Sequence, residues 1–216
     1  MALPFDHPNR DRNPLYLHPR ILGVLEQLMG RISEAGAGEF EVKVLSTHRT
    51  PQEQFELFKQ GREFRNGSWV KISGSQTVTN IDGHSKLSRH NYLPALACDF
   101  GLFRGREYIQ SDEAYDIIGP PAREAGFGWG GDWQSFKDKP HIQLEPKDMF
   151  KGSFVKDVAL QWQRYLKIAG AYTDNLDGIF GDNSHAALRD VTGFDQRTAE
   201  GWEVLFRQFG PLVPDE

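Results

Sequence analysis

Two histidines and an aspartate have the residue types and the spacing of a metal site. His90 and Asp99 stand nine residues apart in the stretch GHSKLSRHNYLPALACDF, residues 83–100, and His141 closes the later segment DKPH. Two imidazoles and a carboxylate are typical ligands of a catalytic zinc ion that keeps one coordination position open. Zinc held in this way lowers the pKa of a coordinated water to about 7 and polarises a carbonyl. These residues therefore indicate zinc-dependent hydrolysis of an amide bond.

Two short strands are expected to position these ligands. In residues 96–100 the side chains alternate between two faces, so that Cys98 faces a core and Asp99 faces the opposite side. The apolar sequence IQL directly after His141 is typical of a short strand, which we expect beside the strand of Asp99.

Arg49 is expected at the corner between a strand and a helix. Residues 40–46, FEVKVLS, alternate apolar and charged side chains as a half-buried strand does. A helix should follow, with Thr50 as its N-cap, Pro51 in its first turn and Glu53 as the capping-box partner. Side chains at such corners often face a cleft, but a local ion pair with a carboxylate is an equally good interpretation of Arg49.

The other patterns predict an α+β fold, a small antiparallel sheet with flanking helices. His7 and His18 lie in an irregular N-terminal arm and are expected at the surface. Trp129 and Trp133, in a glycine-rich segment, are expected to line a ligand groove. Helices are predicted at 21–34, 51–60 and 111–125, the last interrupted by two prolines, and short strands at 69–72 and 77–78 within a long surface excursion.

Composition excludes several classes of protein and of site. The 216 residues carry 25 Lys and Arg against 30 Asp and Glu, a net charge of −5, so we expect no nucleic-acid partner. The single cysteine, Cys98, excludes an intramolecular disulfide and a cysteine-rich zinc site. The sequence shows neither a signal peptide nor a run of about 18 apolar residues, so we expect synthesis in the cytoplasm without membrane insertion.

Three separated motifs resemble those of one enzyme family. SRHNYLPALACDF, GWGGDWQSFKDKPH and STHRTPQEQFELFKQGR are similar to segments of the zinc D-alanyl-D-alanine carboxypeptidases and L-alanyl-D-glutamate endopeptidases, phage endolysins especially. The resemblance implies that His90, Asp99 and His141 bind Zn²⁺ and that Asp138 is the catalytic carboxylate. It also implies that Arg49 binds a substrate carboxylate or the oxyanion of the transition state.

Two further features concern the expected metal ligands: the spacing between His90 and Asp99, and the nearby His84. The spacing of nine residues between His90 and Asp99 is longer than the family's commoner pattern, and the sequence Asn-Tyr-Leu-Pro makes the longer loop. His84, six residues before His90, is a weaker ligand candidate, because the resemblance gives it no metal role; a loop histidine or a hydrogen-bond donor to a ligand is the better interpretation.

A second domain is expected after residue 148. Residues 153–216 are similar to the three-helix peptidoglycan-binding domain, with an amphipathic helix at 154–169, an Asp-Gly-x-Phe-Gly turn, a helix capped by Asp182 or Asn183, and a third at 196–208. The alternative is a helical extension that only packs on the zinc peptidase domain, residues 1–148. A wall-binding domain would raise the effective concentration of an insoluble substrate.

The expected function is that of a phage endolysin that cleaves the L-Ala–D-Glu bond of peptidoglycan stem peptides. Such a protein would be a monomer, would act in the periplasm or cell wall, and would depend on a holin for access to the wall. The alternatives are a D-Ala-D-Ala carboxypeptidase with the same zinc site, a cell-wall-binding protein without activity, and a muramidase that uses paired carboxylates such as Glu53 and Asp138.

Overall fold

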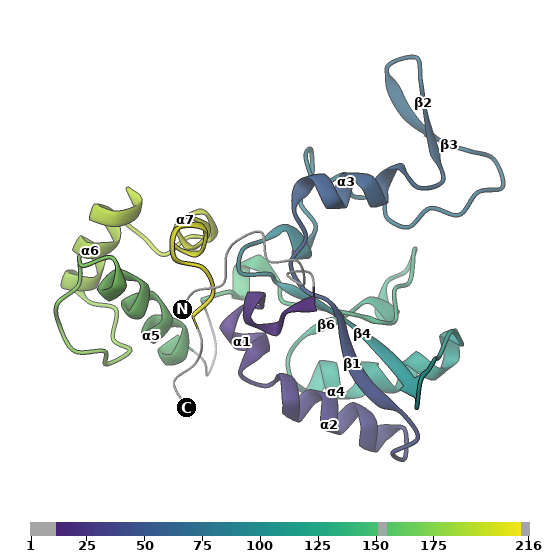
Figure 1. Ribbon diagram of the computed structural model, residues 1–216, viewed down its shortest axis with the longest axis horizontal. Coiled ribbons are helices and arrows are strands. Elements are labelled where there is room, and N and C mark those ends of the chain that lie inside the picture. Colours follow the sequence, from purple (N-terminus) through teal and green to yellow (C-terminus); the bar gives the residue numbers. More distant parts are fainter. Residues whose placement is uncertain (1–11, 151–154, 213–216) are drawn as a thin grey trace.

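A small antiparallel sheet forms the centre of the molecule. The computed structural model describes residues 12–150 and 155–212 (Figure 1). The sheet order is β1 (Glu41–Ser46), β4 (Ala97–Arg104), β7 (His141–Gln143) and β6 (Gly128–Trp129), and β5 (Glu107–Tyr108) pairs with the far end of β4. Cys98 on β4 is fully buried, as its alternation predicted. The sheet and its flanking helices confirm the α+β class.

Helices cover the sheet on one side. Helix α2 (Leu25–Ala35) packs along β1, and α4 (Gly119–Glu124) packs against β6 and α2 (Figure 1). The helix predicted at 21–34 is divided into α1 (Pro19–Leu22) and α2, because the backbone leaves the helical conformation at Val24. The prolines interrupt the helix predicted at 111–125 as expected, leaving a 3-10 helix at Asp112–Ile118 before α4.

Helix α3 (Pro51–Lys59) begins as its capping residues predict. The Thr50 side chain accepts a hydrogen bond from the Glu53 backbone N–H, and the Glu53 carboxylate accepts one from the Thr50 N–H. Beyond α3, β2 (Arg62–Arg65) and β3 (Ser68–Lys71) form a hairpin that projects from the body (Figure 1). The strand predicted at 77–78 is wrong, because that segment pairs with no neighbouring strand.

Three helices form the C-terminal part of the chain, as predicted. These are α5 (Val155–Ile168), α6 (Asp182–Thr192) and α7 (Ala199–Phe209), which pack against one another (Figure 1). The predicted cap of α6 by Asp182 or Asn183 is wrong, because its N-cap is Gly181 and no side chain caps the helix. The buried Gln163 amide donates to the Asp177 carboxylate and the Ile179 carbonyl, and its oxygen accepts from the Gly178 N–H, so one side chain holds the turn between α5 and α6. None of the helices in the described part of the chain has the length and apolar character that a membrane span requires.

The N-terminal segment joins the C-terminal helices to the sheet domain. The Tyr16 ring lies 5.4 Å from that of Phe206, and the His18 ring lies 5.0 Å from that of Trp202. The backbone of the same segment pairs with Ala95 in the loop before β4. His18 is completely buried, so its predicted surface position is wrong, while His7 lies outside the described residues. Local polarity could not reveal this burial, because the groups that cover His18 come from distant parts of the sequence.

The buried His18 predicts a pH-dependent stability. Burial, together with the nearby charge of Arg20, lowers the pKa of His18 from 6.5 to about 3. The unfolded chain therefore binds a proton below about pH 6.5 that the folded chain rejects, so stability is lost as the pH falls, by about 1.4 kcal/mol per pH unit. In urea unfolding between pH 7 and pH 4.5, His18→Gln should show a shallower decline than the wild type. An unchanged decline would contradict this prediction, and His84→Gln, which removes an exposed histidine, is the matched control.

Candidate metal centre and its pocket

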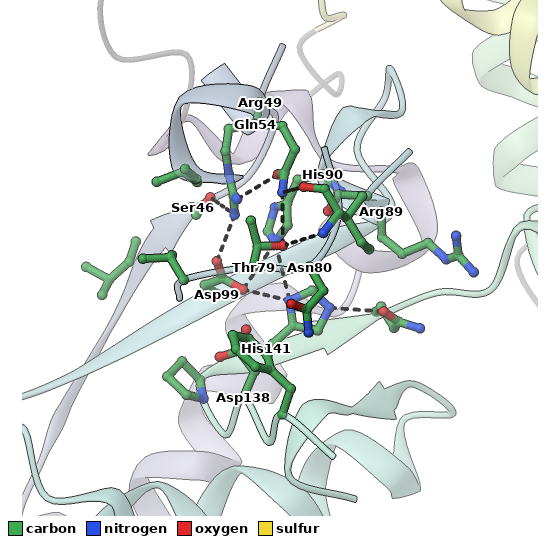
Figure 2. A pocket seen from close by; sticks show the side chains of 18 of the residues that line it. Ser46, Arg49, Gln54, Thr79, Asn80, Arg89, His90, Asp99, Asp138 and His141 are labelled. Atoms are coloured by element: carbon green, nitrogen blue, oxygen red, sulfur yellow. Dashed lines mark hydrogen bonds and ion pairs between the residues drawn. The ribbon is translucent and has the colours of Figure 1, made fainter. Parts of the chain in front are cut away.

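The side chains of His90, Asp99 and His141 meet at one point. Asp99 and His141 are directly paired across β4 and β7, which places both side chains on the same face of the sheet. Asp99 Oδ1 lies 2.8 Å from His141 Nδ1 and 3.2 Å from His90 Nε2, and the two ring nitrogens are 3.3 Å apart (Figure 2). The structure thus brings together all three residues that the sequence suggested as ligands.

The orientation of His90 follows from the end of β1. His90 Nδ1 lies 2.6 Å from the Thr47 carbonyl oxygen, which can only accept a hydrogen bond, so Nδ1 carries the proton. The opposite nitrogen, Nε2, is then left with its lone pair toward Asp99 and His141. Two hydrogen bonds hold the segments together, since the Arg49 backbone N–H donates to the His90 carbonyl and the Asn91 side-chain amide donates to the Arg49 carbonyl.

The long spacing between His90 and Asp99 accommodates a loop that packs against the N-terminal segment. The extra residues leave the site after the short 3-10 helix Arg89–Asn91 and run to Ala95. There the Ala95 N–H donates to the Tyr16 carbonyl and the Ala95 carbonyl accepts from the His18 N–H. The chain re-enters the sheet at Ala97, and Asp99 keeps its register opposite His141.

The three donors suit a tetrahedral zinc ion. Ligands about 2.0–2.1 Å from zinc in tetrahedral geometry lie about 3.3 Å from each other. The ligand atoms of His90, Asp99 and His141 are separated by 2.8, 3.2 and 3.3 Å. Among the described residues this is the one group of three such side chains close enough to hold an ion. Two neutral imidazoles and one carboxylate also match the donor preference of zinc.

Arg49 contacts the candidate metal centre directly. Its Nη2 donates to Asp99 Oδ2 at 3.3 Å and to Ser46 Oγ at 3.2 Å, and its Nη1 donates to Gln54 Oε1 at 3.0 Å (Figure 2). A guanidinium has five N–H donors, so two are left over after these contacts with described residues. The ion pair with a carboxylate and the position at a cleft, which the sequence left as alternatives, both occur.

Asp138 lies next to His141 in the same pocket. Its backbone carbonyl accepts from the His141 N–H, and its own N–H donates to the Gly130 carbonyl. Gly130 permits this approach, since a Cβ there would stand 2.1 Å from the Asp138 carbonyl oxygen. Burial and the charge of Asp99 raise the pKa of Asp138 to about 6, although His141 and Arg49 oppose the shift. A carboxyl group with this pKa can exchange protons near neutral pH.

The electrostatics of the three donors favour a bound cation. Burial alone would raise the pKa of Asp99, but the charges and hydrogen bonds of the two histidines hold it well below its usual range. Burial lowers the pKa of His90, and Arg49 adds to this effect. Burial acts in the same direction on His141, yet its contacts with Asp99 and Asp138 raise its pKa overall. A metal ion would therefore replace the proton that these two carboxylates attract to His141.

A cavity of about 960 Å³ opens above these residues. Its walls include residues from α3, from the loop 78–88 and from the segment 133–140. Trp133 lines the cavity as predicted, whereas Trp129 is buried and its indole N–H donates to the Lys139 carbonyl. His84 is exposed and its ring packs on Phe55, 5.3 Å away, so the structure does not bring it to the three donors.

Two residues that the sequence did not suggest also contribute to the site. Gln54, one turn into α3, contacts Arg49 and is itself buried and bonded to the Ile81 carbonyl. Gln143 follows His141 on the same face of β7 and contacts its ring. The sequence signal for Gln143 was the alternation in HIQLE, which places it on the ligand face.

A family profile and two known peptidases are similar in sequence to this chain. The family profile described as D-alanyl-D-alanine carboxypeptidase matches residues 82–144, a range that contains all three donors and Asp138. The peptidoglycan L-alanyl-D-glutamate endopeptidase CwlK of Bacillus subtilis (strain 168) is 31% identical over 144 residues, which cover 62% of this chain and 76% of that protein. The L-alanyl-D-glutamate peptidase of Listeria phage A118 is 33% identical over 91 residues, 40% of this chain and 32% of that protein.

A solved structure is also similar. The crystal structure of the Serratia marcescens L-Ala D-Glu endopeptidase ChiX aligns with 63% of this chain and 86% of its own, at 24% identity and a TM-score of 0.37. On the profile match and on the similarity to three quarters of CwlK, the chain belongs to the family of D-alanyl-D-alanine carboxypeptidases and L-alanyl-D-glutamate endopeptidases.

Proposed function

We propose that the chain is a zinc-dependent peptidase that cleaves the bond between L-alanine and D-glutamate in peptidoglycan stem peptides. The observation that carries the proposal is the meeting of His90, Asp99 and His141 in one pocket with the half-buried carboxylate of Asp138. Both curated relatives carry names for this peptidase activity, which favours it over carboxypeptidase activity.

The chain's own residues divide the chemistry among them. His90, Asp99 and His141 would hold Zn²⁺, which supplies Lewis acidity at the scissile carbonyl and makes water acidic enough to attack near neutral pH. Asp138 lies beside the proposed ligands without being one of them. It takes a proton from the attacking water and delivers it to the departing amine of D-glutamate.

Arg49 is proposed to bind the substrate. Its contacts with Asp99, Ser46 and Gln54 fix the guanidinium plane, and the two remaining N–H donors can bind a carboxylate or the developing oxyanion. A donor that is already fixed in place need not reorganise when negative charge develops on the substrate. It can therefore stabilise that charge in the transition state more effectively than a mobile donor.

The muramidase alternative is weaker. Glu53 and Asp138 do line the same cavity, which the sequence did not indicate. The Glu53 carboxylate, however, accepts hydrogen bonds from the Thr50 backbone and hydroxyl at the start of α3. This capping role explains Glu53 without any part in catalysis.

The C-terminal helices are proposed to attach the enzyme to the cell wall. In this division residues 1–148 are the peptidase domain and residues 153–216 the wall-binding domain. Ile179 in the turn between α5 and α6 is 70% exposed, and with Leu176 it gives the turn an apolar outer surface suited to binding. We further propose that the protein acts as a monomeric phage lysis enzyme that reaches the wall with the help of a holin; the relative from Listeria phage A118 supports this role.

Chelation separates the proposed function from its alternatives. EDTA should abolish lysis of purified walls, and added zinc should restore it, because the proposed water activation depends on the metal. The chelated protein should still sediment with the insoluble walls, since wall attachment is assigned to helices remote from the metal donors. Lysis that persists in EDTA would indicate a glycosidase, and a protein that sediments but never lyses would be a binding protein.

A further inference from the structure

A chain of polar contacts leads from His141 away from the candidate metal centre. His141 Nε2 lies 3.1 Å from Gln143 Oε1, and Gln143 Nε2 donates to Glu145 Oε1. The second oxygen of Glu145 accepts from Arg89 Nη2 at 2.8 Å. His141 and Gln143 lie on the same face of β7, and Glu145 follows two residues beyond the end of that strand in extended backbone.

The far end of this chain determines the direction of every hydrogen bond in it. An ionised carboxylate only accepts hydrogen bonds, so Glu145 must face the NH₂ group of Gln143 and not its oxygen. The Gln143 oxygen then faces His141, and that oxygen can also only accept. His141 must therefore donate from Nε2, which leaves the lone pair of Nδ1 pointing at Asp99 and His90.

The charge that this arrangement needs is stabilised by Arg89. Partial burial of Glu145 opposes ionisation, but the hydrogen bond and charge of Arg89 lower its pKa overall. Arg89 also directly precedes His90 in the sequence, and its carbonyl accepts from the Leu96 N–H. The contacts therefore connect Arg89, the neighbour of the proposed ligand His90, with the proposed ligand His141.

We propose that Gln143, held in one orientation by the Glu145–Arg89 ion pair, is a positioning residue that makes His141 bind the metal through Nδ1. This inference rests on the proposed metal site and names the groups that select the tautomer of one ligand. Without such a partner the His141 ring could carry its proton on Nδ1, where it would face the site with a donor in place of a lone pair. Outer partners of this kind typically contribute about 10–100-fold to metal affinity.

Zinc affinity of three variants tests the proposal. Gln143→Leu removes the acceptor and should weaken zinc binding by about 10–100-fold, measured by competition with a chromophoric chelator. Glu145→Gln allows the Gln143 side-chain amide to flip and should weaken zinc binding by about tenfold, the lower end of the same range. The exchange Gln143→Glu with Glu145→Gln keeps the total charge and keeps an acceptor facing His141, so its affinity should stay within about threefold of the wild type. Glu39→Gln, which opens an exposed ion pair with Arg104, is the matched control and should change nothing.

Nitrogen NMR of the histidine rings gives a readout that a general loss of structure would not imitate. In the zinc-loaded wild type the His141 Nε2 should carry a proton and Nδ1 should show the shift of a metal-bound nitrogen. Coordination through Nε2 would overturn the proposal, as would a folded Gln143→Leu variant that binds zinc like the wild type. If Gln143→Leu does not fold, the exchanged pair decides, because an affinity as low as that of Glu145→Gln would also overturn it.

The outcomes for this inference are separate from those for the proposed function. A wild-type protein that binds zinc through His141 Nδ1 but cleaves no peptidoglycan contradicts the proposed function and leaves the tautomer result intact. If the enzyme is active and Gln143→Leu leaves its zinc affinity unchanged, only the inference is contradicted. A wild type that binds no zinc contradicts both.

Discussion

Replacing Asp138 by asparagine is expected to lower turnover by about 10²–10⁴-fold, the usual contribution of a positioned general acid or base. The amide has nearly the size of the carboxylate, so the pocket and the contact of the Asp138 backbone with Gly130 should persist. Because Asp138 is not one of the three donors, the variant should hold zinc as well as the wild type does. Steady-state cleavage of a stem peptide and the bound zinc content are the two measurements.

Asp132→Asn provides the matched control for this variant. Asp132 lies only six residues earlier, but its carboxylate pairs with Arg123 at the surface, with about half of each side chain exposed. Exposed pairs contribute little, about 0–1 kcal/mol, so this variant should keep its activity. A normal cleavage rate in Asp138→Asn would show that another group moves the proton.

The pH profile of wild-type activity also tests whether Asp138 transfers the proton. Asp138 must be ionised to accept a proton, so activity should rise with pH through its pKa, which is about 6 in the metal-free chain. A bound dication would lower this pKa further by favouring the charged form. The acid limb of kcat should therefore lie at or below about pH 6 and should vanish in Asp138→Asn.

The second large effect is expected from His90→Ala. If the apparent 10–16 kcal/mol of a zinc site is shared about equally among its ligands, loss of one imidazole should weaken zinc binding by at least about 10²-fold. Lysis should be lost with the metal and should not return at stoichiometric zinc. Equilibrium dialysis against zinc buffers measures the affinity directly.

His84→Ala is the control for the loss of a histidine from the same loop region. Its ring is exposed and packs on Phe55, and it is not among the clustered donors. The variant should therefore bind zinc and lyse walls like the wild type. The opposite pattern, metal loss in His84→Ala with metal retained in His90→Ala, would contradict the proposed ligands.

The features that could be predicted from the sequence were local ones. The capping box at Thr50 fixed the start of α3, because its hydrogen bonds join residues three apart. Alternation predicted β4 and the face of Asp99, and the IQL strand lies beside it as expected. A local signal that the prediction missed is Asn66-Gly67, where both residues have positive φ in the turn of the β2–β3 hairpin.

The features that could not be predicted depend on contacts between distant segments. His18 has a polar neighbourhood in the sequence, yet the loop around Ala95 and helix α7 enclose it. The long spacing before Asp99 likewise makes sense only with that docked segment in place. For the site, the residue types together with the motifs around them pointed to the three proposed donors, which the structure brings together. The bond from Arg49 to Asp99 and the contacts from His141 to Arg89 could be found only in the three-dimensional structure.

The most direct test of the proposed peptidase activity is mass spectrometry of the fragments released from purified peptidoglycan by the zinc-loaded protein. We expect peptides with a new N-terminal D-glutamate, and we expect L-alanine to remain on the glycan strand. The same digestion in EDTA should release nothing. Free D-alanine as the product, or glycan fragments whose peptides are intact, would contradict cleavage of the L-Ala–D-Glu bond.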